Sequence, residues 1–502
     1  MKMIKMKNTE CKTNRSPSKF ISFFLYFTLT VFLFSSCAWF QPARDSSRTK
    51  KQKIGKTKKE KEELLDVMQG RKVYNPETGE WEIIMEVTAK LDTVQWKNLS
   101  PENFPPITSD GSYSDAGFIG PESGESLKNA YKVAFLLPFL SKRFNVLDDE
   151  IFKNSKWALN FYGGVKMAFK LLEREDVNLK VSVLDSDFSE AKVQNLLRTN
   201  SDLAQADLII GPYRRSNLRL VANFARNRKI PLVSPYSASS SITEKNPFYI
   251  QVNPSIKSHC EAITRHVRQK YKTEDVILVA RDIPEEKDRL KYFQEANYQI
   301  EGTRDTASFM QYIIRDASAD FHEMDVTPFI RDSATTVFIL PSYKDETFVY
   351  SFLRQVAVAK TEEDTVVVYG LPQWRDFERI DFDFYENLNV FISSPSFIDN
   401  MDPEIRQFKK QFFEEYGTTA APEALLGYDT MLYFGRMMKK YGTQFYRYLD
   451  QEKAEYLHTT FDFEPVIEKP DAFREVFNQI DRFENKYVHI LKFEDYHFQP
   501  AD

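Results

Sequence analysis

The sequence DLIIGPYRRSNLRLVANFARNRKIPLVSPYSASSS, which runs from Asp207 to Ser241, decides the fold. Two apolar runs, residues 208–210 and 230–233, flank a segment in which apolar residues recur at the i, i+3, i+4 and i+7 spacing of one helix face. These residues are Leu218, Val221, Ala222 and Ala225. Gly211-Pro212 closes the first run, and Ser216 is suited to be the helix N-cap. The stretch therefore predicts two parallel strands joined by a helix.

The same alternation of strand and helix continues on both sides of this stretch. Further strands are predicted at residues 133–137, 179–184, 276–280, 337–340, 366–369, 388–392 and 487–493. Helices are predicted from Ser155, after Ser189, and at residues 256–271, 285–296, 346–359, 403–416 and 427–440. Gly163-Gly164 inside the first of these helices indicates close packing against another element. The pattern predicts an α/β fold with two Rossmann-like lobes, each built on a parallel sheet.

Small hydroxyl residues follow both strands of the Asp207–Ser241 stretch. Ser216 follows the first strand, and the second is followed by Ser234, Ser237, Ser239, Ser240 and Ser241. Ligands of open α/β sheets sit at the carboxyl ends of the strands, and a helix N-terminus at Ser216 would suit an anion. Helix caps and solvated turn residues explain the same serines equally well, so both interpretations stay open.

Composition limits the classes of function. The chain has 502 residues and a formal net charge of −5, which gives no argument for nucleic acid as a partner. Its three cysteines, Cys11, Cys37 and Cys260, are too few for a disulfide framework. Cys260 is predicted to be a lone buried thiol.

The N-terminus has the build of a secretory signal peptide, residues 1–36. Six basic residues precede an apolar segment, residues 20–34, which is short for a membrane-spanning helix. The segment ends in Ser35-Ser36-Cys37, which resembles a bacterial lipobox, with Cys37 as the lipidated residue. An uncleaved membrane anchor is the alternative. Ala38 stands where such lipoproteins carry an aspartate for inner-membrane retention, so an outer-membrane anchor facing the periplasm is favoured.

Residues 37–130 are predicted to tether a globular part that starts near Tyr131. Residues 44–63 are crowded with lysine and lack an apolar period, so they form either a solvated spacer or a contact with anionic lipid. Residues 73–84 predict a small hairpin with its turn at residues 76–79. Residues 100–128 are rich in Pro, Gly, Ser and Asp, as is typical of a linker.

The residues from Tyr131 onward resemble type I periplasmic binding proteins of the leucine/isoleucine/valine-binding class, in a lipoprotein subgroup. The resemblance rests on Gly211-Pro212, KIPLVSP at residues 229–235, NPF at residues 246–248, QVNPS at residues 251–255 and GYD at residues 427–429. It implies two lobes that close on a ligand by hinge motion. Three crossovers would join them, near Asn253, near Ser394 and before Tyr487. Lobe 1 would hold residues 131–253 and 395–485, and lobe 2 residues 254–394 and 486–502.

The resemblance also implies a set of ligand-binding residues. Ser216, Ser237, Ala238 and Ser239 match the positions that hold the ligand's carboxylate in the amino-acid binders, and Tyr343 matches the aromatic clamp. Gln373, beside Trp374, stands where the family has an acidic residue for the ligand's ammonium, which argues against a free amino acid. Asp282 or Asp376 could take that role, or the ligand lacks an ammonium. Arg214-Arg215 would favour an anionic ligand or form a surface pair.

Enzyme motifs are absent from the sequence. It contains no Gly-x-Ser-x-Gly, no P-loop and no Gly-x-Gly-x-x-Gly. His259 and His266 lie seven residues apart rather than the three or four of a metal pair, so we read them as cap or surface residues. The sequence predicts a protein that is not an enzyme and has neither a cofactor nor a bound metal.

Two functions remain. The first is a lipid-anchored periplasmic protein that captures a small polar solute between its lobes, resembling substrate-binding proteins of amino-acid ABC transporters, with a transporter as partner. The alternative is a lipoprotein regulator of cell-wall synthesis, because some outer-membrane lipoproteins with this fold activate cell-wall enzymes by contact. The long tether favours the alternative, since it would reach a partner across the periplasm. A cavity filled by Tyr343 and Trp374 would favour it too.

Overall fold

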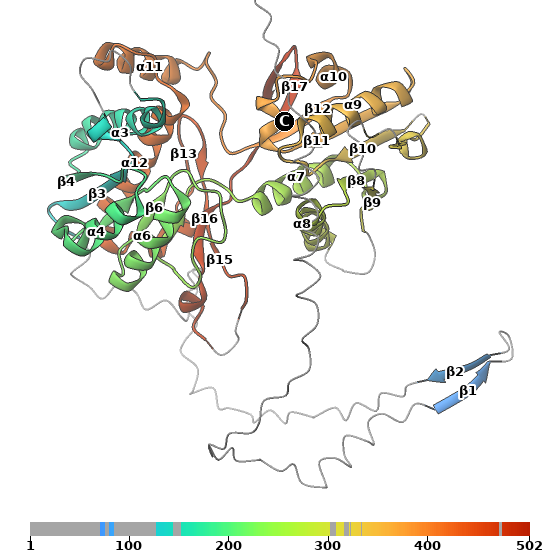
Figure 1. Ribbon diagram of the computed structural model, residues 1–502, viewed down its shortest axis with the longest axis horizontal. Coiled ribbons are helices and arrows are strands. Elements are labelled where there is room, and N and C mark those ends of the chain that lie inside the picture. Colours follow the sequence, from blue (N-terminus) through green and yellow to red (C-terminus); the bar gives the residue numbers. More distant parts are fainter. Residues whose placement is uncertain are drawn as a thin grey trace, which may run out of the picture. The chain divides into compact units, whose positions relative to one another are not determined.

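The computed structural model describes residues 71–75, 80–84, 127–143, 152–301, 308–315, 321, 323–332, 334–470 and 474–501 (Figure 1). Contacts divide the chain into two units, Met1–Ser114 and Asp115–Asp502, and each is described by itself. The predicted signal peptide, Cys37 and the lysine-rich segment lie outside the described residues. Among the helices that are described, none combines the length and the apolar character needed to cross a bilayer.

In the first unit, β1 (Arg71–Asn75) pairs antiparallel with β2 (Glu80–Ile84). Asn75 pairs with Glu80 at the end of the ladder, so four residues separate the strands. The sequence predicts a hairpin here, and the two strands form one.

The second unit contains two sheets, and the first of them has seven strands in the order β15-β16-β7-β6-β5-β3-β4. They are β3 (Tyr131–Leu137), β4 (Leu179–Asp185), β5 (Leu208–Ile210), β6 (Leu232–Ser234), β7 (Tyr249–Gln251), β15 (Phe463–Val466) and β16 (Arg482–Asn485). All neighbours pair in parallel except β15 and β16. The Asp207–Ser241 stretch supplies β5 and β6, whose residues are all buried. It therefore lies within the sheet, as predicted.

The second sheet has seven strands in the order β18-β17-β12-β11-β10-β8-β9. They are β8 (Val276–Arg281), β9 (Met310–Ile314), β10 (Thr335–Ile339), β11 (Thr365–Gly370), β12 (Val390–Ser394), β17 (His489–Glu494) and β18 (His497–Pro500). The five strands β8 to β12 pair in parallel, but β17 and β18 add to them antiparallel. Asp495 and Tyr496 join β17 to β18 with φ of 53° and 62°, as a tight hairpin turn requires. The parallel prediction is correct except at β15 in the first sheet and at β17 and β18 in the second.

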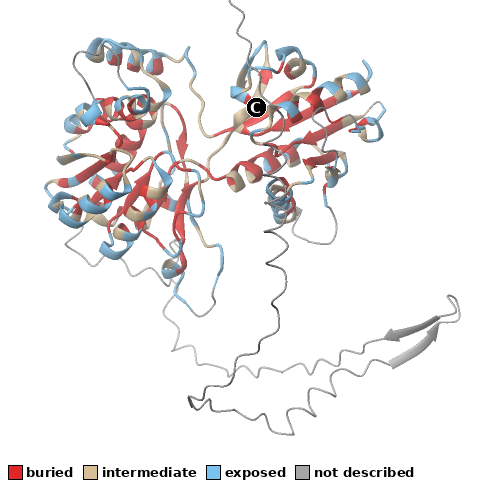
Figure 2. Ribbon diagram, viewed as in Figure 1, coloured by how far each residue is buried: buried red, intermediate tan, exposed pale blue. Residues whose placement is uncertain are grey.

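Helices cover both faces of the first sheet, and we call this assembly lobe 1. One face packs against α3 (Lys156–Arg174) and α12 (Pro422–Tyr441). The other packs against α4 (Glu190–Thr199), α5 (Ser201–Ala204) and α6 (Arg215–Arg228). A further helix, α11 (Pro403–Tyr416), packs against α3. Figure 2 shows the strands as the buried layer of the lobe.

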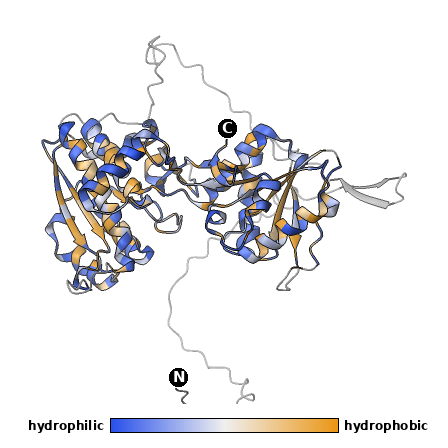
Figure 3. Ribbon diagram, turned by 90° about the horizontal axis from the view of Figure 1, so that it is seen from above, coloured by the Kyte–Doolittle hydropathy of each residue, from blue (hydrophilic) through white to orange (hydrophobic). Residues whose placement is uncertain are grey.

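Lobe 2 repeats this arrangement around the second sheet. One face carries α7 (Ile256–Lys270) and α8 (Pro284–Glu301), and the other carries α9 (Glu346–Ala359) and α10 (Phe382–Asn387). In Figure 3 the strands are the hydrophobic segments and the helices expose hydrophilic positions. Short elements complete the described residues: β13 (Ala454–Glu455), β14 (Thr460–Phe461), and 3-10 helices at Ser141–Arg143, Lys153–Ser155, Thr273–Asp275, Thr327–Phe329, Pro372–Asp376, Gly442–Gln451 and Val476–Gln479.

The prediction of close packing at Gly163-Gly164 is confirmed. A Cβ atom on Gly164 would overlap the backbone carbonyl of Ala424 in α12, and one on Gly427 would overlap the carbonyl of Phe161 in α3. The two helix backbones therefore touch, which only residues without a side chain allow.

The chain passes between the two sheets three times. The passages lie between β7 and α7, between β12 and α11, and between β16 and β17. They match the crossovers predicted near Asn253, near Ser394 and before Tyr487. Two α/β lobes joined by three crossovers are thus the observed fold.

Two local predictions have different outcomes. Ser189 is the N-cap of α4, and its side chain accepts a hydrogen bond from the backbone of Lys192. Ser216 is not a cap, so this prediction is wrong: α6 begins at Arg215, with Arg214 at the N-cap and no side-chain cap bond. Ser216 instead lies in the first turn of α6.

Candidate functional site

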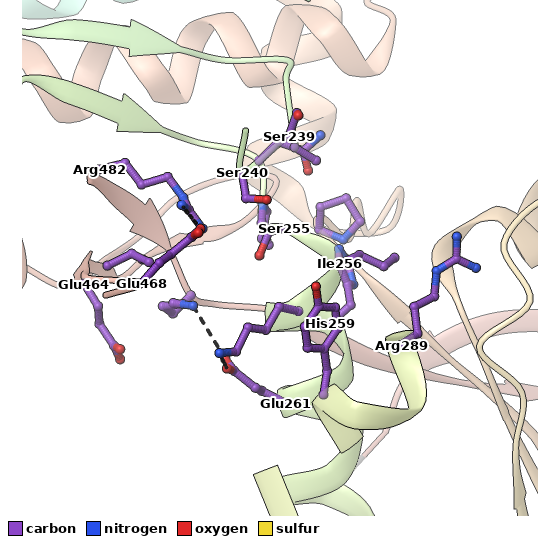
Figure 4. Close-up of a pocket in the computed structure, with 18 of the residues that line it drawn as sticks. Ser239, Ser240, Ser255, Ile256, His259, Glu261, Arg289, Glu464, Glu468 and Arg482 are labelled. Carbon is purple, nitrogen blue, oxygen red and sulfur yellow. Dashed lines mark hydrogen bonds and ion pairs between the residues drawn. The ribbon is translucent and has the colours of Figure 1, made fainter. Parts of the chain in front are cut away.

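A cavity of ≈ 1010 Å³ lies between the two lobes, at the three crossovers. Lobe 1 contributes Ala238, Ser239 and Ser240 from the loop after β6. The crossovers contribute residues 253–257, Pro395 and Lys486. Lobe 2 contributes faces of α7 and α8 and the loops after β10 and β11. Figure 4 shows side chains from both lobes around this space.

Four of the eight predicted ligand-binding residues line the cavity. Ala238 and Ser239 do so from lobe 1, and Tyr343 and Gln373 from lobe 2. The structure therefore brings the predicted loops of both lobes together around one space. Ser216, Ser237, Asp282 and Trp374 are not among the lining residues.

Trp374 belongs to the core of lobe 2. Its side chain is 0 % exposed, and its Nε1 donates a hydrogen bond to the carbonyl of Ser342 at 3.0 Å. The indole lies over Gly370, where an added Cβ would overlap the ring. Trp374 thus holds the loop after β10 in place through this hydrogen bond. Its neighbour Gln373, and not Trp374, lines the cavity.

The other three predicted residues have local partners or positions away from the cavity. Asp282 pairs with Lys287 at 2.5 Å, and the hydrogen bond and charge of this lysine lower the carboxyl pKa. Ser237 Oγ accepts a bond from the backbone N of Ser239 at 3.3 Å, so it shapes the lining loop. The Ser216 hydroxyl is buried, with no hydrogen-bond partner among the described residues.

A cluster of paired charges forms the hinge side of the cavity. We call it the hinge charge cluster: Glu261, Glu468, Arg482, Glu484 and Lys486. Glu484 is 0 % exposed and bonds Arg482 at 2.8 Å. Lys486 lies 3.5 Å from Glu261 and 3.7 Å from Glu484. Arg482 also pairs with Glu468 at 2.9 Å, so every charge of the cluster has an opposite partner.

Hydrogen bonds from the start of α7 complete this cluster. Glu484 accepts from the backbone N of Ser255 at 2.9 Å and from the hydroxyl of Ser258 at 2.5 Å. Burial acts to raise the pKa of Glu484, but the charges of Lys486 and Arg482 and these hydrogen bonds outweigh it and lower the pKa to about 2. The cluster therefore connects β16, the third crossover and α7, and the carboxylate of Glu484 within it is ionised at neutral pH.

His259 is buried beside the same cluster. It is 4 % exposed and lines the cavity, and its Nδ1 has no hydrogen-bond partner among the described residues. Burial lowers its pKa to about 4, against a smaller opposing effect of Glu484, so the imidazole is neutral at neutral pH. The interpretation of His259 and His266 as cap or surface residues is wrong. His266 is also buried, and its Nδ1 lies 2.9 Å from the hydroxyl of Tyr369.

Several residues that line the cavity could not be predicted from the sequence. Arg265, Arg289 and Glu295 lie on the faces of α7 and α8 turned to the cavity. Their spacing in the sequence is the same as that of residues on any other exposed helix face. Asn253 and Ser255 could be expected near the cavity, because their segment is predicted to form the first crossover.

No group of three or more His, Cys, Asp or Glu able to hold a metal occurs in the part of the chain that is described. Cys260 is a free, buried thiol, as predicted, and burial raises its pKa.

Comparison with known proteins agrees with this geometry. A family model described as periplasmic binding protein matches residues 155–453, more than half of the 502-residue chain. A structure from Rhodospirillum rubrum, described as a branched-chain amino acid ABC transporter protein, has 14 % identity and a TM-score of 0.55. The match covers 74 % of this chain and 100 % of that one.

Other solved structures are similar at lower TM-scores. The ABC transporter substrate-binding protein from Desulfitobacterium hafniense in complex with Leu has 14 % identity and a TM-score of 0.47, over 74 % of this chain and 100 % of that one. LpoA from Haemophilus influenzae has 13 % identity and a TM-score of 0.48, over 75 % of this chain and 60 % of that one. No curated protein matches the sequence. The family consists of binding proteins, and the chain belongs to the periplasmic binding protein family.

Proposed function

We propose that the chain is a lipid-anchored, periplasm-facing binding protein that captures a small polar solute between its two lobes. The observation that carries this proposal is the ≈ 1010 Å³ cavity at the crossovers, to which both lobes contribute side chains. A volume near 1000 Å³ is at the upper end of what small-molecule sites use. The family's location supports a place in the periplasm or cell envelope.

The walls of the cavity suit a polar solute. Ser239 and Ser240 offer hydroxyl groups from lobe 1, and Gln373 offers an amide from lobe 2. Tyr343 is half-buried, and burial raises the pKa of its hydroxyl, which therefore stays protonated and can donate a hydrogen bond. These groups can orient a ligand, and we assign no chemical step to them. An amino acid remains a candidate ligand, and an ABC transporter a candidate partner.

The alternative function, a regulator of cell-wall synthesis acting by contact, has less support in the cavity. Trp374 is in the core rather than in the cavity, and Tyr343 lines the space without filling it. The predicted tether of residues 37–130 still favours this alternative, because a contact regulator has to reach its partner. The alternative would be favoured if no compound of a ligand screen binds and the protein captures a cell-wall enzyme.

The test is calorimetric titration of the full-length chain in detergent with amino acids, organic acids, sugar phosphates and cell-wall fragments. A ligand at about 100 times its dissociation constant should also stabilise the fold by roughly 2.7 kcal/mol, which a thermal melt detects. If no compound binds and no melt shifts, capture of such a solute is refuted.

The anchor needs a separate experiment. We propose that Cys37 carries the lipid and that residues 1–36 are removed. Labelling of cells with a radioactive fatty acid should mark the wild-type chain and leave Cys37→Ala unmarked. Equal labelling of both chains would refute the proposal.

A further inference from the structure

The charges in the cavity wall are unevenly matched. Among its basic side chains, Arg482 and Lys486 are paired in the hinge charge cluster, and Lys257 lies 3.7 Å from Glu295. Arg289 also lines the cavity, but no carboxylate of the described residues lies within ion-pair distance of it. It is therefore the half-buried charge of this wall that the protein itself leaves uncompensated.

Arg289 is held in place by neutral groups. Its Nη1 donates to the carbonyl of Pro341 at 2.6 Å, and its guanidinium lies 5.6 Å from the ring centre of Tyr343. Both contacts come from the loop after β10, so they fix the guanidinium without neutralising it. A guanidinium has five N–H donors in a planar fork, and the bond to Pro341 occupies one side of it. The remaining donors suit the two oxygens of a carboxylate or phosphate.

Two neighbours in the wall agree with an anionic ligand. Arg265 of α7 lines the same cavity, is exposed, and has no ion pair with the described carboxylates. The buried His259 directs no negative charge at the space, because burial keeps its imidazole neutral. In Figure 4, His259 and Arg289 lie on the same side of the space, facing Ser239 and Ser240 of lobe 1.

Acidic side chains also line the cavity, but most of them are paired with basic residues other than Arg289. Glu261 and Glu468 are bound to Lys486 and Arg482, and Glu295 to Lys257. Glu464 lines the cavity from β15, at the edge strand of lobe 1. The lobe 2 wall around Tyr343 thus presents cationic and neutral groups to a solute.

We propose that the solute captured by this protein carries an acidic group, a carboxylate or a phosphate, and that Arg289 on α8 is the residue that binds it. This inference rests on the proposed function, because it names the ligand class of the same cavity. It gives lobe 2 the anion-binding role that the resemblance assigns to the serine loops of lobe 1.

The test uses matched probes that differ in whether they carry an acidic group, titrated calorimetrically into the full-length chain in detergent. The pairs are leucine and leucinamide, succinate and succinamide, and glucose 6-phosphate and glucose. We expect one acidic probe to bind, and its counterpart without the acidic group to bind about 10- to 100-fold more weakly, the range expected for a hydrogen-bonded charge. The carboxylate and phosphate arms identify which acid is bound.

Variants assign the effect to Arg289. Arg289→Gln should weaken the acidic probe by a similar factor of about 10 to 100 and remove the difference between the members of the pair. Arg289→Lys keeps the charge and should recover part of the affinity. The matched control is Arg375→Gln, at an exposed arginine two residues after Gln373 that does not line the cavity, and it should bind like the wild type. Circular dichroism melts of all variants check that they fold.

The outcomes separate the two proposals. If a probe without the acidic group binds as tightly as its acidic partner, or if a folded Arg289→Gln binds like the wild type, the acidic-ligand inference is overturned and solute capture stands. If neither member of any pair binds to the wild type, both the inference and capture of these solutes are refuted.

Discussion

The hinge charge cluster and the region around Arg289 line the same cavity but treat charge in opposite ways. In the cluster, Glu484 and Arg482 are almost completely buried, at 0 % and 3 % exposure, and each charge has an opposite partner. Around Arg289 the partners are a carbonyl oxygen and an aromatic ring. Removing one member of a buried ion pair leaves an unpaired charge in a poorly solvated place, whereas a half-buried charge on a cavity wall keeps its solvent. The cluster should therefore serve stability and Arg289 should serve binding.

The largest effect is expected from the cluster. Glu484→Gln removes the buried partner of Arg482 and leaves it only the exposed Glu468, so it should lower the free energy of unfolding by about 3–5 kcal/mol. Urea denaturation of the full-length chain measures this. The control is Glu464→Gln, an exposed carboxylate of the same cavity, which should stay within about 0.5 kcal/mol of wild type. Equal effects of the two substitutions would remove the distinction between the cluster and the rest of the wall.

The second prediction concerns pH and His259. Its pKa of about 4 in the folded protein lies below the ordinary value of 6.5, so between these pH values the unfolded chain binds the proton more readily. Stability should fall as pH drops from 6.5 to 4, by up to about 3 kcal/mol from this residue. His489, also with a pKa lowered to about 4 by burial and by His458, acts in the same window.

Melts at several pH values check this, and His259→Gln should flatten part of the slope. Glu484 contributes over a different window, because its lowered pKa makes its stabilising effect disappear as pH falls from the ordinary value of 4.5 towards 2. A slope between pH 6.5 and 4 that His259→Gln leaves unchanged would contradict the assignment.

The third prediction tests the wall that lobe 1 contributes. Ser239→Ala combined with Ser240→Ala should weaken any bound solute by about 3- to 10-fold, because neutral hydrogen bonds contribute less than charged ones. Stability should stay within about 0.5 kcal/mol, since neither serine is buried. Calorimetry of the double variant measures the loss. A loss larger than that of Arg289→Gln would reverse the ranking of the two walls.

The smallest effect is expected from Arg265. This exposed arginine should act on the solute through its charge alone, so Arg265→Gln should weaken an acidic probe by about 2- to 5-fold and leave stability within about 0.5 kcal/mol. The loss should disappear in high salt, which screens exposed charges. A salt-independent loss would show a direct contact instead.

The sequence predicts most of the fold because buried parallel strands are continuous apolar runs, as in the Asp207–Ser241 stretch. It misses β13 and β14 and, in the two seven-stranded sheets, β7, β9, β15, β16 and β18, which are short or contain polar residues. The pairing of β16 is set by a distant contact: Glu484 is a strand residue because Gln251 lies beside it in β7.

The candidate site is predicted in part for a similar reason. Loops after parallel strands meet at one edge, so Ser239 and Tyr343 could be expected near one space. Tyr343 and Trp374 look alike in sequence, as aromatic residues just after strands. The indole of Trp374 packs into the core of lobe 2 because Gly370 has no side chain to occupy that space, which the sequence alone does not reveal. Arg289 has no sequence signal, because its role depends on which neighbours lack a carboxylate.

The position of the last strands has a consequence for the order in which the protein can assemble. The chain emerges during synthesis with its N-terminus first, so β16, β17 and β18, within residues 482–500, emerge after all the other strands of the two sheets. Until then β7 and β12, each inside its finished sheet, remain open edges that would pair with other chains. The sheet of lobe 1 is complete only after Asn485 has been made, and that of lobe 2 only after Pro500, so one short segment completes both lobes. A chaperone that shields both edges until that moment would prevent aggregation of the nascent chain.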